Sequence, residues 1–98
     1  MEKKNASNHP TFDQKVFVVK ASQLKTKKSL FAGQAASLCQ ALSDLTRRKG
    51  SKVTGADLRQ FLENRRESYF PGSRQSEALR IFQDWRSQLA RVGILKAA

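Results

Sequence analysis

Two stretches of this chain repeat their apolar residues with the spacing of an amphipathic helix. In each stretch, apolar side chains recur at positions i, i+4, i+7, i+11 and i+14, which places them on one face of a helix. The first stripe is Phe31, Ala35, Leu38, Leu42 and Leu45, and the second is Ala78, Phe82, Trp85, Leu89 and Val92. This pattern predicts two helices that share one core, with Trp85 near its centre.

Residues that favour helix ends divide the chain around these stripes. Ser29 is placed to cap the first helix and Gly50 is placed to end it. Thr54 and Asp57 have the spacing of a capping box, in which each side chain accepts a hydrogen bond from the other residue's backbone amide. A middle helix is therefore predicted from this box to about Arg66, which makes three amphipathic helices around one core.

The turn before the last helix and the end of that helix are also marked. Pro71 disfavours helix at the residue before it, and Gly72 permits a turn. Ser73 or Ser76 is then expected to cap the last helix. Gly93 suits the left-handed residue that commonly follows a helix, so the last helix is predicted to end there.

The N-terminal part of the chain shows no helical period. Residues 1–12 are polar and predict a disordered tail, so a single small helical domain is expected at 13–98. The β-branched run Val16–Val19 predicts a strand, and residues 20–29 predict a basic connector. Because one strand needs a partner, residues 94–96 are expected to pair with it. The predicted fold class is mainly α: a three-helix, helix-turn-helix-like domain with a short N-terminal strand pairing with the C-terminal tail.

Charge is the strongest feature of the composition. The 98 residues include 19 Lys and Arg against 8 Asp and Glu, which gives a formal net charge of +11 and a pI near 10.6. A small chain this basic most often meets a polyanion. Lysine dominates the N-terminal half and arginine the C-terminal half, which suggests a lysine arm beside a more structured arginine surface.

Several classes of chemistry lack the residues that they require. The single cysteine is Cys39 and the single histidine is His9, so neither a disulfide framework nor a zinc site is predicted. The sequence has no glycine-rich phosphate loop and no closely paired acid and base. We therefore expect a non-enzyme with no cofactor and no small-molecule substrate. Because the sequence has neither a long apolar run nor a secretory signal, we also expect a soluble, cytoplasmic protein with no membrane partner.

The order of these elements is similar to that of a winged helix-turn-helix domain. The resemblance covers residues 29–96: a first helix, the step Val-Thr-Gly-Ala-Asp-Leu into a second, and a third helix that opens at Ser73 and closes as Leu-Ala-Arg-Val-Gly-Ile-Leu. The resemblance implies a DNA-binding protein whose third helix enters the major groove. Two departures are visible, because residues 67–72 form a longer turn than usual and no wing hairpin follows Ile94.

The candidate contacts to nucleic acid form two groups. Arginine and glutamine near the start of the third helix are the side chains that read guanine and adenine edges. The candidates on and just before this helix are Arg74, Gln75, Arg80, Arg86 and Arg91. The candidate phosphate contacts are Lys25, Lys27, Lys28, Arg47, Arg48, Lys49 and Lys52. For both groups the alternative is a solvated charged face that serves solubility.

The turn before the third helix contains two aromatic residues beside two arginines. Tyr69 and Phe70 follow Arg65 and Arg66 closely in the sequence. These rings either stack on bases or anchor their loop to the core, and anchoring is the favoured interpretation.

Three functions remain open from the sequence. The favoured one is a small DNA-binding regulator or accessory factor that uses the third helix, as in transcription regulation. The second is an RNA-binding accessory factor, which a lysine arm serves equally well. The third is a protein-interaction module whose basic surface meets an acidic partner. The sequence leaves the oligomeric state and the target sequence open.

Overall fold

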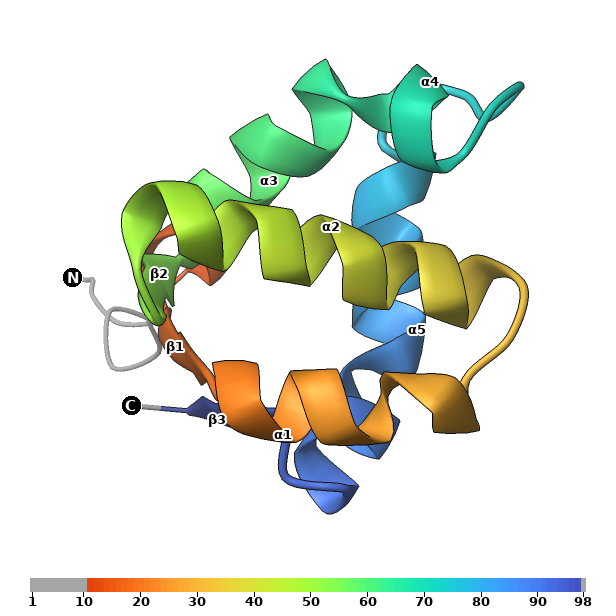
Figure 1. Cartoon of the computed structure of the whole chain (residues 1–98). Coiled ribbons are helices and arrows are strands. Elements are labelled where there is room, and N and C mark those ends of the chain that lie inside the picture. The colour runs from red at the N-terminus through yellow and green to blue at the C-terminus, as the bar shows by residue number, and fades with distance from the viewer. Residues whose placement is uncertain (1–10, 98) are drawn as a thin grey trace, which may run out of the picture.

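A three-stranded antiparallel sheet closes one side of the structure, a computed structural model that describes residues 11–97 (Figure 1). β1 (Val16–Val19) is the central strand and lies between β2 (Lys52–Thr54) and β3 (Leu95–Ala97). The expected pairing of the N-terminal strand with the C-terminal tail is confirmed. The sequence does not predict β2. Because both edges of β1 are paired, its backbone groups find their partners within the sheet.

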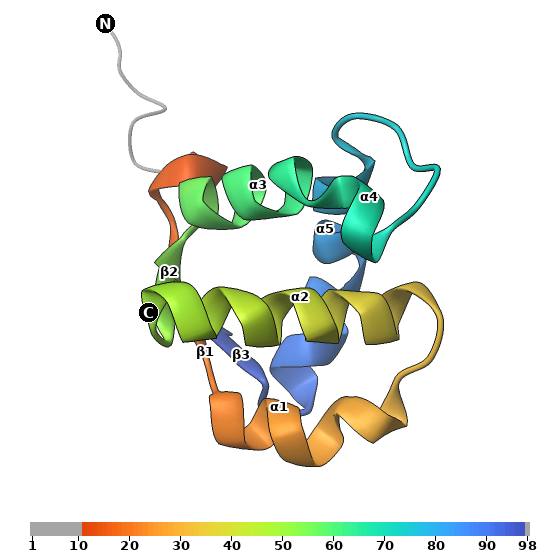
Figure 2. The same ribbon diagram turned by 45° about the horizontal axis from the view of Figure 1, so that its top comes forward.

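Five α-helices of the described chain pack against this sheet and against one another. They are α1 (Ala21–Lys27), α2 (Gln34–Lys49), α3 (Gly55–Asn64), α4 (Arg66–Tyr69) and α5 (Glu77–Arg91), and two 3-10 helices cover Phe12–Gln14 and Lys28–Leu30. α1, α2 and α3 lie side by side, and α5 crosses behind them (Figure 1, Figure 2). The mainly helical fold class is therefore confirmed.

The core lies where α2, α3 and α5 meet the inner face of the sheet. Phe17 and Val19 point inward from β1, whereas Val16 and Val18 on its outer face are half-buried. The rings of Phe17 and Phe82 pack edge to face with centroids 5.8 Å apart. No polar or charged residue of the described chain is buried as a whole. The core is thus an apolar cluster that ties the sheet to α5.

Most positions of the two predicted stripes are buried, but Phe31, Trp85 and Val92 are only half-buried. α2 begins only after Gly33, whose φ of 63° breaks the helical path, so the predicted start at Ser29 is wrong. Phe31 consequently lies in the turn before α2. Trp85 is half-buried, and Phe82 takes the central position that the sequence assigns to Trp85. The rings of Phe31 and Trp85 pack edge to face at 6.0 Å.

The predicted helix ends agree with the structure at the start of α3 and at the end of α2. Thr54 Oγ1 accepts from the Asp57 amide at 3.1 Å, and Asp57 Oδ2 accepts from the Thr54 amide at 3.0 Å, so the capping box is confirmed. Gly50 ends α2 with a φ of 85°. At the start of α5, Ser76 has the N-cap position, but its φ is 70° and its hydroxyl caps no amide. α3 ends at Asn64, before the predicted end of the middle helix.

The segment predicted as a basic connector, residues 20–29, contains α1. Leu24 is the buried residue of this seven-residue helix and is 2% exposed. A single buried leucine in two turns gives no apolar period, which is why the pattern does not predict a helix. The helix forms because Leu24 docks on the core.

The predicted disordered tail, residues 1–12, lies outside the described residues except for Thr11 and Phe12. Thr11 precedes the first 3-10 helix. The centroid of the Phe12 ring lies 5.8 Å from that of Phe17 and 6.0 Å from that of Phe82. These two residues therefore belong to the folded domain.

Gly55 allows this first 3-10 helix to lie directly on the start of α3. Its amide donates to the Lys15 carbonyl at 2.8 Å, and a Cβ at this position would lie 1.7 Å from the Phe12 carbonyl oxygen. We expect Gly55→Ala to lower the free energy of unfolding by about 2 kcal/mol or more, because backbone must shift. Urea denaturation of the wild type and the variant would measure this difference in the free energy of unfolding.

Gly72→Ala is the matched control for this prediction. Gly72 has a φ of 80°, but no atom lies within 4 Å of the added Cβ, so its cost is limited to backbone strain of about 1 kcal/mol. Equal losses in the two variants would show that the close approach to Phe12 contributes nothing.

Candidate nucleic-acid interface

Two long segments of the chain contain no acidic residue, and the fold brings them together. No Asp or Glu occurs between Asp13 and Asp44, and none follows Asp84. The first segment supplies β1 and α1, and the second supplies the last turns of α5 and β3. The Lys20 amide donates to the Ile94 carbonyl at 2.7 Å, which joins the two segments directly.

An open hollow of about 410 Å³ lies where these segments meet. Its polar lining, which we call the basic hollow, consists of Lys20, Gln23, Lys27, Arg91 and Lys96. Among residues 11–97 no carboxylate lines it, so its positive charge is not balanced by the described part of the chain. Such a surface attracts phosphate groups and releases their condensed counterions.

Lys27 has a structural role in this hollow. Its Nζ donates to the Val92 carbonyl at 2.8 Å, in a partly buried contact. Carbonyls in the last turn of a helix lack partners within the helix, and the negative end of the helix dipole favours a cation there. Lys27 therefore holds α1 against the end of α5, while Lys20, Arg91 and Lys96 remain exposed.

The basic surface continues from the hollow onto the outer face of the sheet. Val18 of β1 is opposite Lys52 of β2 on one side and Lys96 of β3 on the other. Directly paired residues point to the same face of a sheet, so the two exposed lysines flank the half-buried valine. Two strand spacings separate them, which is about 10 Å. Lys52 thus belongs to the same surface as the hollow.

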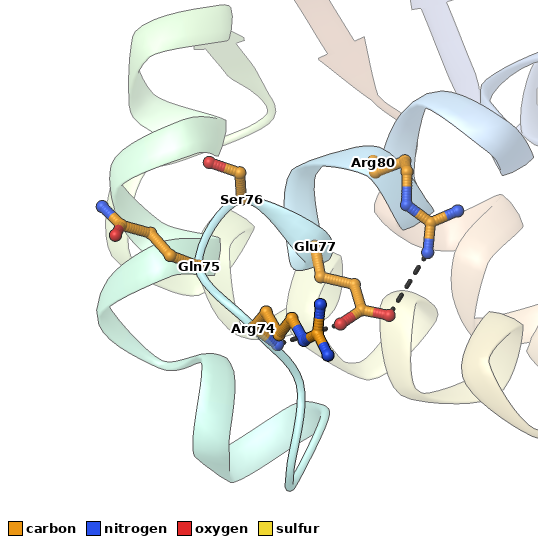
Figure 3. Close-up of a pocket in the computed structure, with 5 residues that line it drawn as sticks. All are labelled: Arg74, Gln75, Ser76, Glu77 and Arg80. Atoms are coloured by element: carbon orange, nitrogen blue, oxygen red, sulfur yellow. Dashed lines mark hydrogen bonds and ion pairs between the residues drawn. The ribbon is translucent and has the colours of Figure 1, made fainter.

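At the start of α5, by contrast, the predicted base-reading residues share their surface with carboxylates. A hollow of about 550 Å³ is lined by Arg74, Gln75, Ser76, Glu77 and Arg80 (Figure 3). Glu77 accepts from the Arg74 amide at 2.9 Å and pairs with Arg80 at 3.2 Å. The hydrogen bond from Arg74, with the nearby charge of Arg80, lowers the pKa of Glu77. The carboxylate is therefore ionised and opposes an incoming phosphate.

Arg80 and Arg86 are each engaged within the protein. Besides Glu77, Arg80 pairs with Asp84 at 3.2 Å, and its side chain is 61% exposed. The Arg86 guanidinium lies 4.9 Å from the centre of the Phe17 ring, where it contributes to packing through a cation–π contact. Of the arginines predicted on the third helix, Arg91 alone lines the basic hollow.

The remaining predicted phosphate contacts are distributed over two places. Lys25 and Lys28 are exposed on α1 and the 3-10 helix after it, in the same acid-free segment as the hollow. At the end of α2, Arg47 pairs with Asp44 at 2.7 Å and Lys49 pairs with Asp57 at 3.5 Å. Arg48 lies 6.0 Å from the centre of the Phe61 ring. The twelve predicted residues therefore do not form one surface.

Lys20 and Lys96 are the basic residues of this surface that were not among the predicted contacts. Neither belongs to a basic cluster in the sequence. The pairing of β1 with β3, continued by the bond from Lys20 to Ile94, brings Lys20 and Lys27 to Arg91 and Lys96. The available signal is the absence of acidic residues from both segments, which is visible in the sequence without the fold.

No protein family, curated protein or solved structure matches the chain. Within residues 11–97, no group of three or more His, Cys, Asp or Glu is placed to hold a metal ion. The helices of this part of the chain are too short or too polar to span a bilayer. The arrangement of charge is therefore the feature from which a function is argued.

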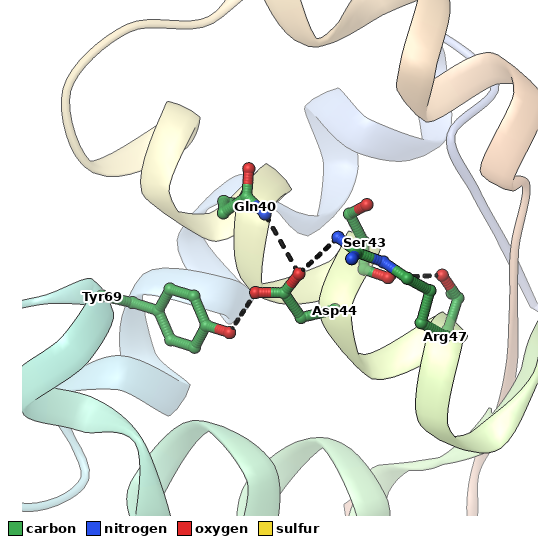
Figure 4. Close-up of polar contacts among 6 residues, drawn as sticks. Gln40, Ser43, Asp44, Arg47 and Tyr69 are labelled. Atoms are coloured by element: carbon green, nitrogen blue, oxygen red, sulfur yellow. Dashed lines mark hydrogen bonds and ion pairs between the residues drawn. The ribbon is translucent and has the colours of Figure 1, made fainter.

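Tyr69 anchors the turn before α5 through a partly buried polar contact with α2. Its hydroxyl donates to Asp44 Oδ2 at 2.5 Å, and Asp44 Oδ1 accepts from Gln40 at 3.0 Å and from Arg47 at 2.7 Å (Figure 4). The next residue, Phe70, is buried in the core. Burial and the hydrogen bond to Asp44 raise the pKa of Tyr69 to about 12.

This shifted pKa gives a direct test of the site, because Tyr69 is the single tyrosine of the chain. Titration of tyrosinate absorbance is expected to give a pKa of about 12, and Asp44→Asn is expected to lower it toward the ordinary value of 10. Because the folded pKa is raised, the neutral phenol stabilises the fold below about pH 10, and this contribution is lost as the pH rises toward 12.

Asp84→Asn is the control for this titration, because it removes a carboxylate on another helix. Circular dichroism at each pH would show that the protein is still folded. A folded wild type with an ordinary tyrosine pKa would contradict the hydrogen bond to Asp44.

Proposed function

We propose that this chain is a small nucleic-acid-binding protein, a DNA-binding regulator or accessory factor. The observation that carries the proposal is the basic hollow, which is lined by no carboxylate of residues 11–97 and is continued on the sheet by Lys52. Elsewhere in residues 11–97, each acidic side chain except Glu67 pairs with a lysine or arginine. Most of the described cations without such a partner lie on or beside α1, the end of α5 and the sheet, and Arg48, Arg65 and Arg74 are the exceptions.

The resemblance to a winged helix-turn-helix domain favours DNA over RNA in this proposal. The proposal takes α2, α3 and α5 as the three helices on which this resemblance is based. Residues 65–76, which include α4, separate α3 from α5, so the connection is much longer than the usual three or four residues. α5 is therefore proposed as the third helix of a divergent arrangement.

Affinity and base reading are assigned to different surfaces. Phosphate contacts from the basic hollow would supply sequence-independent affinity. Base contacts by Arg74 and Arg80 would require the Arg80 pairs with Glu77 and Asp84 to open. Exposed pairs of this kind each contribute at most about 1 kcal/mol, so opening them is inexpensive.

The proposal is tested by the salt dependence of binding to a DNA duplex. The double variant Lys20→Gln, Lys96→Gln is expected to weaken binding to all sequences alike. It should also lower the salt slope by about 1 for each residue that contacts a phosphate. Lys49→Gln removes the same charge from a lysine that is paired with Asp57, and it is expected to change the slope less. Fluorescence anisotropy at several salt concentrations would measure the slopes.

Two outcomes would contradict this assignment. An equal loss of slope per lysine removed in the double variant and in Lys49→Gln would show that total charge, and not the basic hollow, determines binding. Absence of duplex binding at low salt would overturn the DNA proposal, and comparison with RNA and an acidic protein would then identify the partner class.

A further inference from the structure

We propose that a second basic site, between α2 and the α3–α4 junction, binds a phosphate monoester. This arginine pocket is lined by Asp44, Arg47, Arg48, Arg65 and Tyr69 and has a volume of about 230 Å³. It is distinct from the basic hollow, because α1 lies on one side of α2 and α3 and α4 lie on the other (Figure 1, Figure 2). The inference therefore does not rest on nucleic-acid binding by the hollow.

Phe61 positions two of the arginines. The guanidinium carbons of Arg65 and Arg48 lie 4.7 Å and 6.0 Å from the centre of its ring. A guanidinium beside an aromatic ring keeps its N–H donors available for a bidentate contact with an oxyanion. In the described part of the chain, neither guanidinium has a carboxylate within ion-pair distance or a hydrogen-bonded partner.

Asp44 does not neutralise these two arginines. Its Oδ2 accepts from Tyr69, and its Oδ1 accepts from Gln40 and pairs with Arg47. The Asp44 charge is thus balanced by Arg47, which leaves Arg48 and Arg65 as two uncompensated charges in one small pocket. A phosphate monoester carries about −1.5 to −2 at neutral pH, whereas a phosphodiester carries a single charge. The charge of the pocket therefore matches the monoester.

Helix ends alone do not explain this arrangement. Arg48 is in the last turn of α2 and Arg65 follows α3, where cations favour the negative end of the helix dipole. That interaction accounts for an arginine at each helix end. It does not require both side chains to converge on Phe61 and line one pocket with Tyr69.

The probe for this site is inorganic phosphate, added at constant ionic strength with chloride as the reference anion. Protein labelled with ¹⁵N at arginine is expected to show saturable shifts of the Arg48 and Arg65 side-chain resonances. Arg48→Gln and Arg65→Gln are each expected to weaken phosphate binding about tenfold or more, because each removes a charge-assisted contact. Arg65→Lys keeps the charge and the approximate volume but loses the planar pair of N–H donors, so it should still weaken phosphate binding.

Arg74→Gln is the matched control, since it removes an exposed arginine that does not line the pocket. Circular dichroism would confirm that every variant folds. Wild-type binding in Arg65→Gln and Arg48→Gln, or shifts that grow linearly over all arginines, would overturn the proposal. The Lys20→Gln, Lys96→Gln double variant should bind inorganic phosphate normally, which separates this test from that of duplex binding.

Two sources can supply a phosphate monoester: a small phosphate in solution and the terminal phosphate of a nucleic-acid strand. Comparison of a 5′-phosphorylated oligonucleotide with its 5′-hydroxyl form distinguishes them. If the 5′-phosphorylated oligonucleotide binds more tightly and Arg65→Gln removes this difference, the result would support the arginine pocket as a site for the terminal phosphate of a strand. If the two oligonucleotides bind equally and inorganic phosphate still binds, the result would support the arginine pocket as a site for a free phosphate.

Discussion

β1 is the central strand of the sheet, and both of its partners come from distant parts of the chain. β2 follows α2, and β3 follows α5, so this one strand ties the N-terminal segment to the middle and the end of the sequence. The Val19 amide donates to Ser51 at 2.7 Å and the Lys20 amide donates to Ile94 at 2.7 Å, which extends both pairings toward α1. The position of α1 beside the end of α5 depends on these bonds, and so does the basic hollow.

The acidic residues are few, and their placement determines where the positive charge is effective. Arg80 has two carboxylate partners, and Arg47, Lys49, Arg59 and Arg66 have one each. Such exposed pairs contribute little to stability, but they cancel the field of the cation that they hold. The net charge of +11 is therefore spread unevenly over the molecule. The surface near the start of α5 is less positive than this total suggests, and the surface formed by the two acid-free segments is more positive.

Much of the helical framework could be predicted from the sequence, because local rules determine it. The capping box at Thr54, the end of α2 at Gly50 and the β-branched run at Val16–Val19 are each marked by neighbouring residues in the sequence. α1 and β2 are short, and their stability comes from contacts with distant residues, so no local period marks them. The candidate site is less predictable for the same reason. Lys20 and Lys96 meet only through strand pairing.

The two proposed anion sites differ in the chemistry of their cations, and the fold separates them. The lysines of the basic hollow carry point charges on flexible stems, which suits a polyanion whose phosphates pass at variable positions. Arg48 and Arg65 are held beside Phe61 as planar forks, which suits one compact anion in one orientation. Lysine lies mainly in the N-terminal half of the sequence and arginine mainly in the C-terminal half. That division does not by itself produce the two sites, because Arg48 lies in the N-terminal half and Lys96 in the C-terminal half. The packing of α1 and α3 on either side of α2 is what separates the two surfaces.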